Sequence, residues 1–173
     1  MSPEEIKALV LDVPDFPKPG IVFKDITPLL SDNAAFSGIT HHLAEAAALH
    51  PADGILAIES RGFLFGAALA NRISLPLHLV RKRGKLPRAT VSVEYELEYG
   101  TDHVEVHADA IEPGRRYLIV DDVIATGGTA AAAADLVEQQ GGAVAACLFV
   151  LELSFLNGRD RLGNRSISSL ITY

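Results

Sequence analysis

The chain has 173 residues, of which 49% are hydrophobic and 21% are charged. This length and composition predict one globular domain, 1–173, and exclude a disordered chain and a pair of domains of ordinary size. The 15 basic and 22 acidic residues give a net charge of −7, which argues against general nucleic-acid binding, because there is no positive excess to neutralise a phosphate backbone.

The N-terminus from Met1 to Glu5 lacks the basic start and apolar core of a signal peptide. No apolar stretch approaches the ~20 residues that span a bilayer, so we expect a cytoplasmic protein without membrane contact. The single cysteine, Cys147, lies in the apolar run 143–151. We expect it to be a buried small hydrophobe rather than a nucleophile, which would need an electropositive and partly exposed setting.

The N-terminal segment begins with a helix signal. Ser2-Pro3-Glu4-Glu5 forms a capping-box pattern with proline at the first helical position, and it predicts a short helix that runs through Val10. The prolines of 13–20 then require extended or turning backbone. After the segment 21–26, the alanine-rich stretch 33–49 is predicted to be helical.

From residue 54 onward, apolar runs alternate with segments of helical length and composition. The predicted strands are 54–58, 75–80, 117–120 and 143–151, and the predicted helices between them include 63–72 and 129–140. This alternation predicts an α/β fold with a parallel central sheet flanked by helices.

One segment breaks the alternation. Apolar residues occupy every second position of 91–99, a turn follows at 99–102, and 103–106 returns. We therefore expect a β-hairpin inserted between the second and third core strands. The basic, glycine-containing stretch 81–88 precedes it, so the whole region, about 83–107, is a candidate lid.

The strongest chemical signal is the run Leu-Ile-Val-Asp-Asp-Val-Ile-Ala-Thr-Gly-Gly-Thr at 118–129. An apolar strand is expected to end at Asp121 and Asp122, followed by a short glycine-containing loop and a helix. Free backbone N–H groups and a partial positive charge make the helix N-terminus a binding site for phosphate. The glycines have no side chains, so they allow an anion to approach the backbone closely. The two carboxylates would repel a phosphate unless they bind sugar hydroxyls or a phosphate-bound magnesium ion. The P-loop and dinucleotide-binding patterns are absent.

A second junction of the same kind follows the strand 54–58. Its loop is Glu59-Ser60-Arg61-Gly62, and it leads into the predicted helix 63–72. The start of that helix is a second candidate anion site. The Arg61 guanidinium can grip a pyrophosphate with two parallel hydrogen bonds, which lysine cannot do.

The run 118–129 resembles the signature with which type I phosphoribosyltransferases bind phosphoribosyl pyrophosphate (PRPP). Together with 16–26, 59–66, 81–87 and 97–100, it extends the likeness over about Val13 to Glu152, and these segments resemble those of the adenine phosphoribosyltransferases. The resemblance implies the type I phosphoribosyltransferase fold, with a hairpin lid and a small N-terminal hood segment. It assigns no function to 157–173.

The resemblance also implies a reaction and a set of roles. The reaction is purine salvage, in which adenine and PRPP yield AMP and pyrophosphate, with Mg²⁺ bound through PRPP rather than directly by protein side chains, in a homodimer. Glu98 would be the candidate proton acceptor, Arg61 would stabilise the leaving pyrophosphate, and Tyr99 would help to close the lid. The residues that would bind PRPP are Ser60, Arg61, Lys82, Lys85, Asp121, Asp122, Ala125, Thr126, Gly127, Gly128 and Thr129. Those that would bind adenine are Val22, Phe23, Lys24 and Leu153.

Alternatives remain open at this point. The chain could be a sister transferase for hypoxanthine, guanine, xanthine or orotate, or a non-catalytic PRPP-sensing regulator of the same fold. A regulator would need a nucleic-acid-binding surface, which the net charge of −7 disfavours. Phe23 could be ordinary core, Glu98 the polar face of an alternating strand, and 81–88 a solvated run of charge.

Overall fold

The computed structural model describes residues 1–97 and 100–173. Its helices are α1 (Pro3–Lys7), α2 (Thr27–Ser31), α3 (Asn33–Ala48), α4 (Gly62–Ile73), α5 (Gly128–Gln139) and α6 (Arg159–Leu162), with a 3₁₀ turn at Ser154–Leu156. Its strands are β1 (Leu11–Pro14), β2 (Val22–Asp25), β3 (Gly54–Ile58), β4 (Leu77–Lys82), β5 (Thr90–Glu96), β6 (Thr101–His107), β7 (Arg116–Ile124), β8 (Ala143–Glu152) and β9 (Ile167–Thr172).

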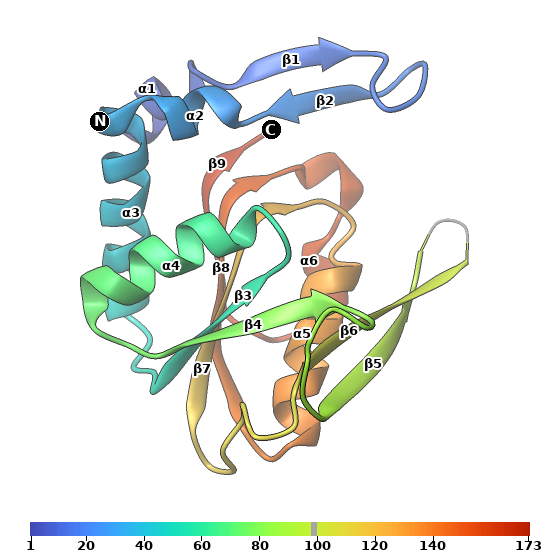
Figure 1. Ribbon diagram of the computed structural model, residues 1–173. Helices are drawn as coiled ribbons and strands as arrows, with labels where there is room; N and C mark the ends of the chain where they lie inside the picture. Colours follow the sequence, from blue (N-terminus) through green and yellow to red (C-terminus); the bar gives the residue numbers. More distant parts are fainter. Residues whose placement is uncertain (98–99) are drawn as a thin grey trace.

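A seven-stranded sheet in the order β5-β6-β4-β3-β7-β8-β9 forms the centre of the molecule, with helices on both faces (Figure 1). The pairs β4–β3, β3–β7, β7–β8 and β8–β9 are parallel, whereas β6 pairs antiparallel with both β4 and β5. The predicted α/β class with a mostly parallel sheet is therefore confirmed.

The parallel strands are apolar along their length because both of their faces are covered. Leu118 and Val120 of β7 belong to a buried cluster with Phe65 of α4, while Ile119 between them belongs to a second cluster with Leu136 of α5. Successive side chains of a strand point to opposite faces, so one apolar run supplies both cores. Each such side chain contributes about 1.5–3 kcal/mol by its burial.

The strand order places two loops side by side. From β3 the chain crosses to β4 on one side of the sheet, and it later returns as β7 on the other side of β3. The loops at the carboxyl ends of β3 and β7 therefore open together at a topological switch point, which is where open α/β sheets bind ligands.

A separate antiparallel sheet of β1 and β2 forms a hood at the end of the molecule where the C-terminus lies (Figure 1). A cation–π contact ties the hood to Tyr173, directly after β9: Lys24 Nζ of β2 lies 4.1 Å from the centroid of the Tyr173 ring. Lys7 Nζ of α1 lies 4.4 Å from the same centroid. The last residue of the chain thus helps to hold the predicted hood segment.

The predicted hairpin is confirmed as β5 and β6, inserted between the second and third core strands. Strand β6 joins the sheet through the pairs Arg81↔Glu105 and Lys82↔Val104 of β4. Val104 and Val106 belong to the same buried cluster as Leu136 of α5. One end of the hairpin is thereby anchored in the core.

Some predicted boundaries need correction. Helix α1 ends at Lys7 rather than Val10, because Leu11–Pro14 pairs with β2. Strand β7 does not end before the aspartates but continues to Ile124, because β8 pairs with it along this length. Helix α2 and strand β9 were not foreseen.

Within the described residues, no helix combines the length and apolar composition needed to cross a membrane.

Candidate active site

A cavity of about 570 Å³ is lined by residues from the hood, the loop after β3, the ends of β4 and β7 and the segments that follow β7 and β8. It brings together predicted site residues that are far apart in the sequence: Phe23, Lys24, Ser60, Arg61, Lys82, Asp121, Asp122, Ala125, Thr129 and Leu153. Glu59 and Val123 complete its lining.

A smaller pocket of about 100 Å³ adjoins this cavity, since Asp121, Ala125 and Thr129 line both. Its other walls include Thr126, Gly127 and Gly128 at the start of α5. Gly127 adopts a left-handed conformation with φ of 81° and accepts the first helical hydrogen bond, from Ala131 N, at 2.9 Å. The first N–H groups of a helix have no partner within it, so this pocket can hold an anion.

The C-terminal segment supports the phosphate loop from behind. A Cβ atom on Gly127 would lie 2.1 Å from Gly158 O, and one on Gly158 would lie 2.3 Å from Ala125 O. Two glycines are therefore required where these backbones meet. Sequence reasoning missed this role of Gly158, because Asn157-Gly158 signals only a turn and not what the turn packs against.

The same segment is held by an ion pair between a half-exposed arginine and a buried carboxylate. Arg159 donates two hydrogen bonds to Glu152, at 2.7 and 2.6 Å. These bonds, more than the opposing effect of burial, lower the pKa of Glu152. Glu152 directly precedes Leu153 in the cavity wall, so the pair helps to place both that wall and Gly158.

The acidic pair on β7 lies beside Arg61. Asp122 is 5% exposed, and its Oδ2 lies 2.6 Å from Arg61 Nε, an ion pair without hydrogen-bond geometry. Asp121 Oδ1 accepts a hydrogen bond from Asp122 N at 2.9 Å. Burial, and then the neighbouring Asp122 carboxylate, raise the pKa of Asp121 well above its usual value. Hydroxyl donors or further positive charge would relieve this repulsion.

The basic stretch 81–88 is hydrogen-bonded to the loop after β3. Glu59 Oε2 accepts hydrogen bonds from Lys82 N at 2.9 Å and Arg81 Nε at 3.0 Å. Although burial alone would raise it, these bonds lower the pKa of Glu59, which stays ionised at neutral pH. Its charge is satisfied by these donors, so Glu59 can border an anion site.

The walls of the cavity also include apolar groups. The Phe23 ring lies 5.4 Å from the Arg61 guanidinium carbon and packs edge-on against Phe16, at 5.2 Å between centroids. Leu153 lines the same cavity from the end of β8. A flat base and a charged pyrophosphate could therefore both be accommodated in one cavity.

The comparisons with known proteins agree with this geometry. The family model of the phosphoribosyl transferase domain matches residues 29–161. The adenine phosphoribosyltransferase of Chloroflexus aurantiacus is 51% identical, with all of both chains covered. The crystal structure of the enzyme from Thermoanaerobacter pseudethanolicus is similar with a TM-score of 0.97 and 53% identity, over 99% of this chain and 100% of that one. The chain belongs to the adenine phosphoribosyltransferases. A further member, from Saccharomyces cerevisiae, is 42% identical with a TM-score of 0.91 over 97% of each chain, and was solved with adenine and an imino-altritol bisphosphate.

Some residues that the family resemblance assigned lie outside the cavity lining. Val22, in β2, is 49% exposed, and Lys85 lies on the exposed turn after β4. Glu98 and Tyr99 lie outside the described residues, so their assigned roles stay predictions. The remaining assigned residues line the cavity or the phosphate pocket.

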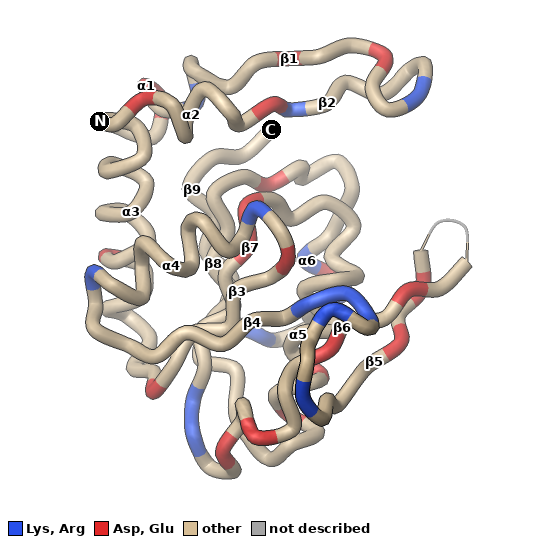
Figure 2. Tube along the Cα trace, viewed as in Figure 1, with Lys and Arg blue, Asp and Glu red and all other residues tan. Residues whose placement is uncertain are grey.

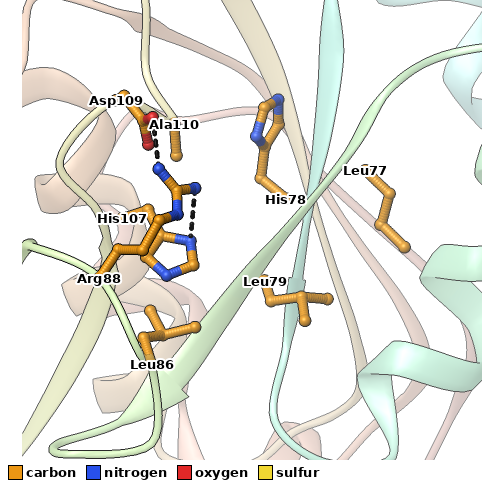
Figure 3. Close-up of a pocket in the computed structure, with 8 residues that line it drawn as sticks. All are labelled: Leu77, His78, Leu79, Leu86, Arg88, His107, Asp109 and Ala110. Carbon is orange, nitrogen blue, oxygen red and sulfur yellow. Dashed lines mark hydrogen bonds and ion pairs between the residues drawn. The ribbon is translucent and has the colours of Figure 1, made fainter.

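A second cavity, of about 290 Å³, is lined by residues of β4, of the stretch after β4 and of the end of β6, and contains none of the predicted site residues (Figure 3). Arg88 donates there to Asp109 Oδ2 at 2.6 Å and contacts His107 Nδ1 at 3.2 Å. Burial lowers the pKa of His78, which is therefore neutral at pH 7. The residues that line this cavity include no helix N-terminus, which distinguishes it from the phosphate pocket at the start of α5.

Proposed function

We propose that the 570 Å³ cavity is the active site in which the enzyme transfers the 5-phosphoribosyl group of PRPP to adenine. The products of this purine-salvage reaction are AMP and pyrophosphate. The observation that carries this proposal is the continuity of three subsites. The helix N-terminus, the acidic pair and Arg61 line one connected space, which matches the phosphate, ribose and pyrophosphate of a single ligand.

In the proposed complex, the 5′-phosphate lies against the backbone of 125–129 at the start of α5. Asp121 and Asp122 hold the ribose hydroxyls, which relieve the repulsion between the carboxylates. Ser60, Arg61 and Lys82 bind the pyrophosphate, and Lys85 reaches it from the exposed turn.

Magnesium is proposed to enter with PRPP. Asp122, which is buried, and Asp121, which is partly buried, fit a site for Mg²⁺-bound PRPP, because their negative charge complements the ion while the PRPP oxygens are the hard donors that Mg²⁺ prefers. When bound through PRPP, Mg²⁺ neutralises part of the charge that develops on the pyrophosphate. Arg61 and Lys82 supply the remaining positive charge from the protein.

The base is proposed to lie between Phe23 and Leu153. Val22 and Lys24 are two residues apart on β2, so their backbone groups point to the same edge of the strand. Strand β2 pairs only with β1 in the described part of the chain, which leaves one of its edges free to recognise a base. Such backbone hydrogen bonds would read the edge of adenine.

Departure of pyrophosphate leaves positive charge on the ribose ring, as in glycosyl transfer generally. The acidic pair favours this charge, and adenine N9 attacks the opposite face, so the configuration at the anomeric carbon inverts. Glu98 is proposed to accept the N9 proton. Closure of the hairpin with Tyr99 would exclude water, which would otherwise hydrolyse PRPP.

The test is AMP formation by Arg61→Ala and Asp122→Ala variants. Each should lose at least about 100-fold in kcat/KM, because each removes a charge aimed at the reacting groups. Arg88→Ala, in the second cavity, is the matched control and should retain activity. Near-normal turnover by both site variants would refute the proposal. Pyrophosphate release with adenine, hypoxanthine, guanine and xanthine decides the base.

A homodimer is part of the same proposal. It rests on the resemblance to the family. Sedimentation equilibrium should give twice the chain mass of 18.5 kDa. A monomer at micromolar concentration would contradict this part.

A further inference from the structure

The ammonium group of Lys82 is occupied by residues of the hairpin. Its Nζ contacts Tyr95 OH of β5 and Asp102 Oδ2 of β6, although Lys82 also lines the cavity. Figure 2 shows the basic stretch at the end of β4 lying against the hairpin, whose strands carry acidic residues. The cation assigned to pyrophosphate binding is thus paired with a carboxylate of the hairpin.

The hydrogen bonds around Lys82 form one network. Because lysine only donates, Tyr95 OH accepts from Lys82, and it also accepts from Thr129 Oγ1 at 3.3 Å. The single Tyr95 proton is donated to Asp102 Oδ2 at 3.2 Å. The network therefore links the end of β4, both strands of the hairpin and the phosphate-binding end of α5.

Both members of the ion pair are charged at neutral pH. The hydrogen bond from Lys82 lowers the pKa of Asp102. Burial alone would lower the pKa of Lys82, but the hydrogen bonds to Asp102 and Tyr95 outweigh it and raise that pKa. The side chains are 37% and 33% exposed, so water screens the pair and an incoming anion can displace it.

The pair also lies where the hairpin leaves the sheet. The pairing of β4 with β6 ends at Lys82↔Val104, and Asp102 is two residues further toward the hairpin tip. The hairpin beyond this point pairs only with itself in the described sheet. Among the described residues, the contacts of Lys82 with Asp102 and with Tyr95 opposite it therefore tie β4 to the hairpin beyond the end of their strand pairing.

We propose that Asp102 is a positioning residue that holds Lys82 in the resting enzyme and is exchanged for the pyrophosphate group of PRPP. Pyrophosphate then replaces Asp102 as the counter-ion of Lys82, so that substrate binding releases this tie of the hairpin to β4. Asp102 competes with the substrate and sets its affinity. This inference rests on the proposed role of Lys82 in pyrophosphate binding.

The test measures binding of inorganic pyrophosphate by calorimetry, together with KM for PRPP and for adenine. Asp102→Asn keeps the size of the side chain and removes its charge. Pyrophosphate should bind roughly threefold to fivefold more tightly to this variant, the scale expected for a partly exposed ion pair. KM for PRPP should fall by a similar factor while KM for adenine stays unchanged, and Asp102→Glu should restore the parent values.

Asp109→Asn is the matched control, because Asp109 is also an ion-paired aspartate of this region but faces the second cavity. It should leave pyrophosphate affinity unchanged. Asp102→Ala provides a second variant if Asp102→Asn does not fold. Unchanged or weaker pyrophosphate binding by a folded Asp102 variant would overturn the inference.

A Lys82→Ala variant separates this inference from the function on which it rests. If Lys82→Ala weakens pyrophosphate binding and Asp102→Asn does not strengthen it, only the exchange of counter-ions fails. If Lys82→Ala leaves pyrophosphate binding unchanged, the assignment of Lys82 to the pyrophosphate fails, and the inference fails with it.

Discussion

Gly158→Ala tests how the C-terminal segment supports the phosphate loop. Gly158 has φ of −60° and ψ of −25°, a conformation that alanine adopts without strain. The substitution therefore changes only the packing. The new Cβ would lie 2.3 Å from Ala125 O and 2.9 Å from Ile124 Cγ1.

The size of the effect follows from these distances. Real Cβ atoms essentially never lie closer than 3.0 Å to another heavy atom, and the distance to Ala125 O would be about 0.7 Å shorter than that. Backbone surrounds the site, so the loop itself must move. Overpacking of this kind costs about 1–3 kcal/mol of unfolding free energy. A misplacement approaching 1 Å at a binding site lowers kcat/KM by roughly 10-fold to 100-fold.

The assay is steady-state AMP formation with varied PRPP, combined with urea unfolding. KM for PRPP should rise more than KM for adenine. Gly38→Ala is the control: its Cβ would approach no atom closer than 3.5 Å, and alanine within helix α3 should stabilise the protein by up to about 1 kcal/mol. If Gly158→Ala keeps both the KM for PRPP and the unfolding free energy of the parent, the packing argument is wrong.

Three further predictions follow from the structure. Arg159→Leu should lower the unfolding free energy by about 1–2 kcal/mol at pH 7, a value discounted because Arg159 is half exposed. Because Arg159 lowers the pKa of Glu152, this stabilisation is present above the usual glutamate pKa of 4.5 and is lost as the pH falls through the lowered pKa. The difference in unfolding free energy between variant and parent, measured with urea, should therefore be smaller at pH 3 than at pH 7. Burial raises the pKa of Cys147 to about 12, so a thiol reagent at pH 8 should label it only after denaturation, and rapid labelling of the native protein would contradict the buried position. Phe23→Ala should raise KM for adenine roughly 10-fold through the lost ring contact, whereas Phe155→Ala, at a 66% exposed position, should not change it.

Local patterns predicted most of the central elements. The apolar run 54–58 coincides with β3, and the alternating segment after residue 90 forms the predicted hairpin. Strand β9 was missed because Ser168 and Ser169 interrupt its apolar residues, and its place at the edge of the sheet comes from pairing with β8. Strand β7 was predicted too short because its pairing with β8 outweighs the polarity of the two aspartates.

In the candidate site, too, local segments could be predicted from the sequence and long-range contacts could not. The phosphate loop could be identified because its glycines, threonines and helix start are adjacent in the chain. The support from Gly158 could not, because it depends on a contact between segments about thirty residues apart. The roles of Glu98 and Tyr99 stay predictions, because both residues lie outside the described part of the chain.

The amino-acid sequence by itself determined the chemistry of each binding segment, because hydrogen-bond donors, carboxylates and guanidinium groups are properties of short runs of residues. Tertiary structure alone decided which segments meet: the order β4-β3-β7 joins two loops into one cavity, the C-terminal segment packs behind the phosphate loop, and Asp102 pairs with Lys82. These contacts depend on strand order and helix packing summed over the whole chain, and no local pattern records them.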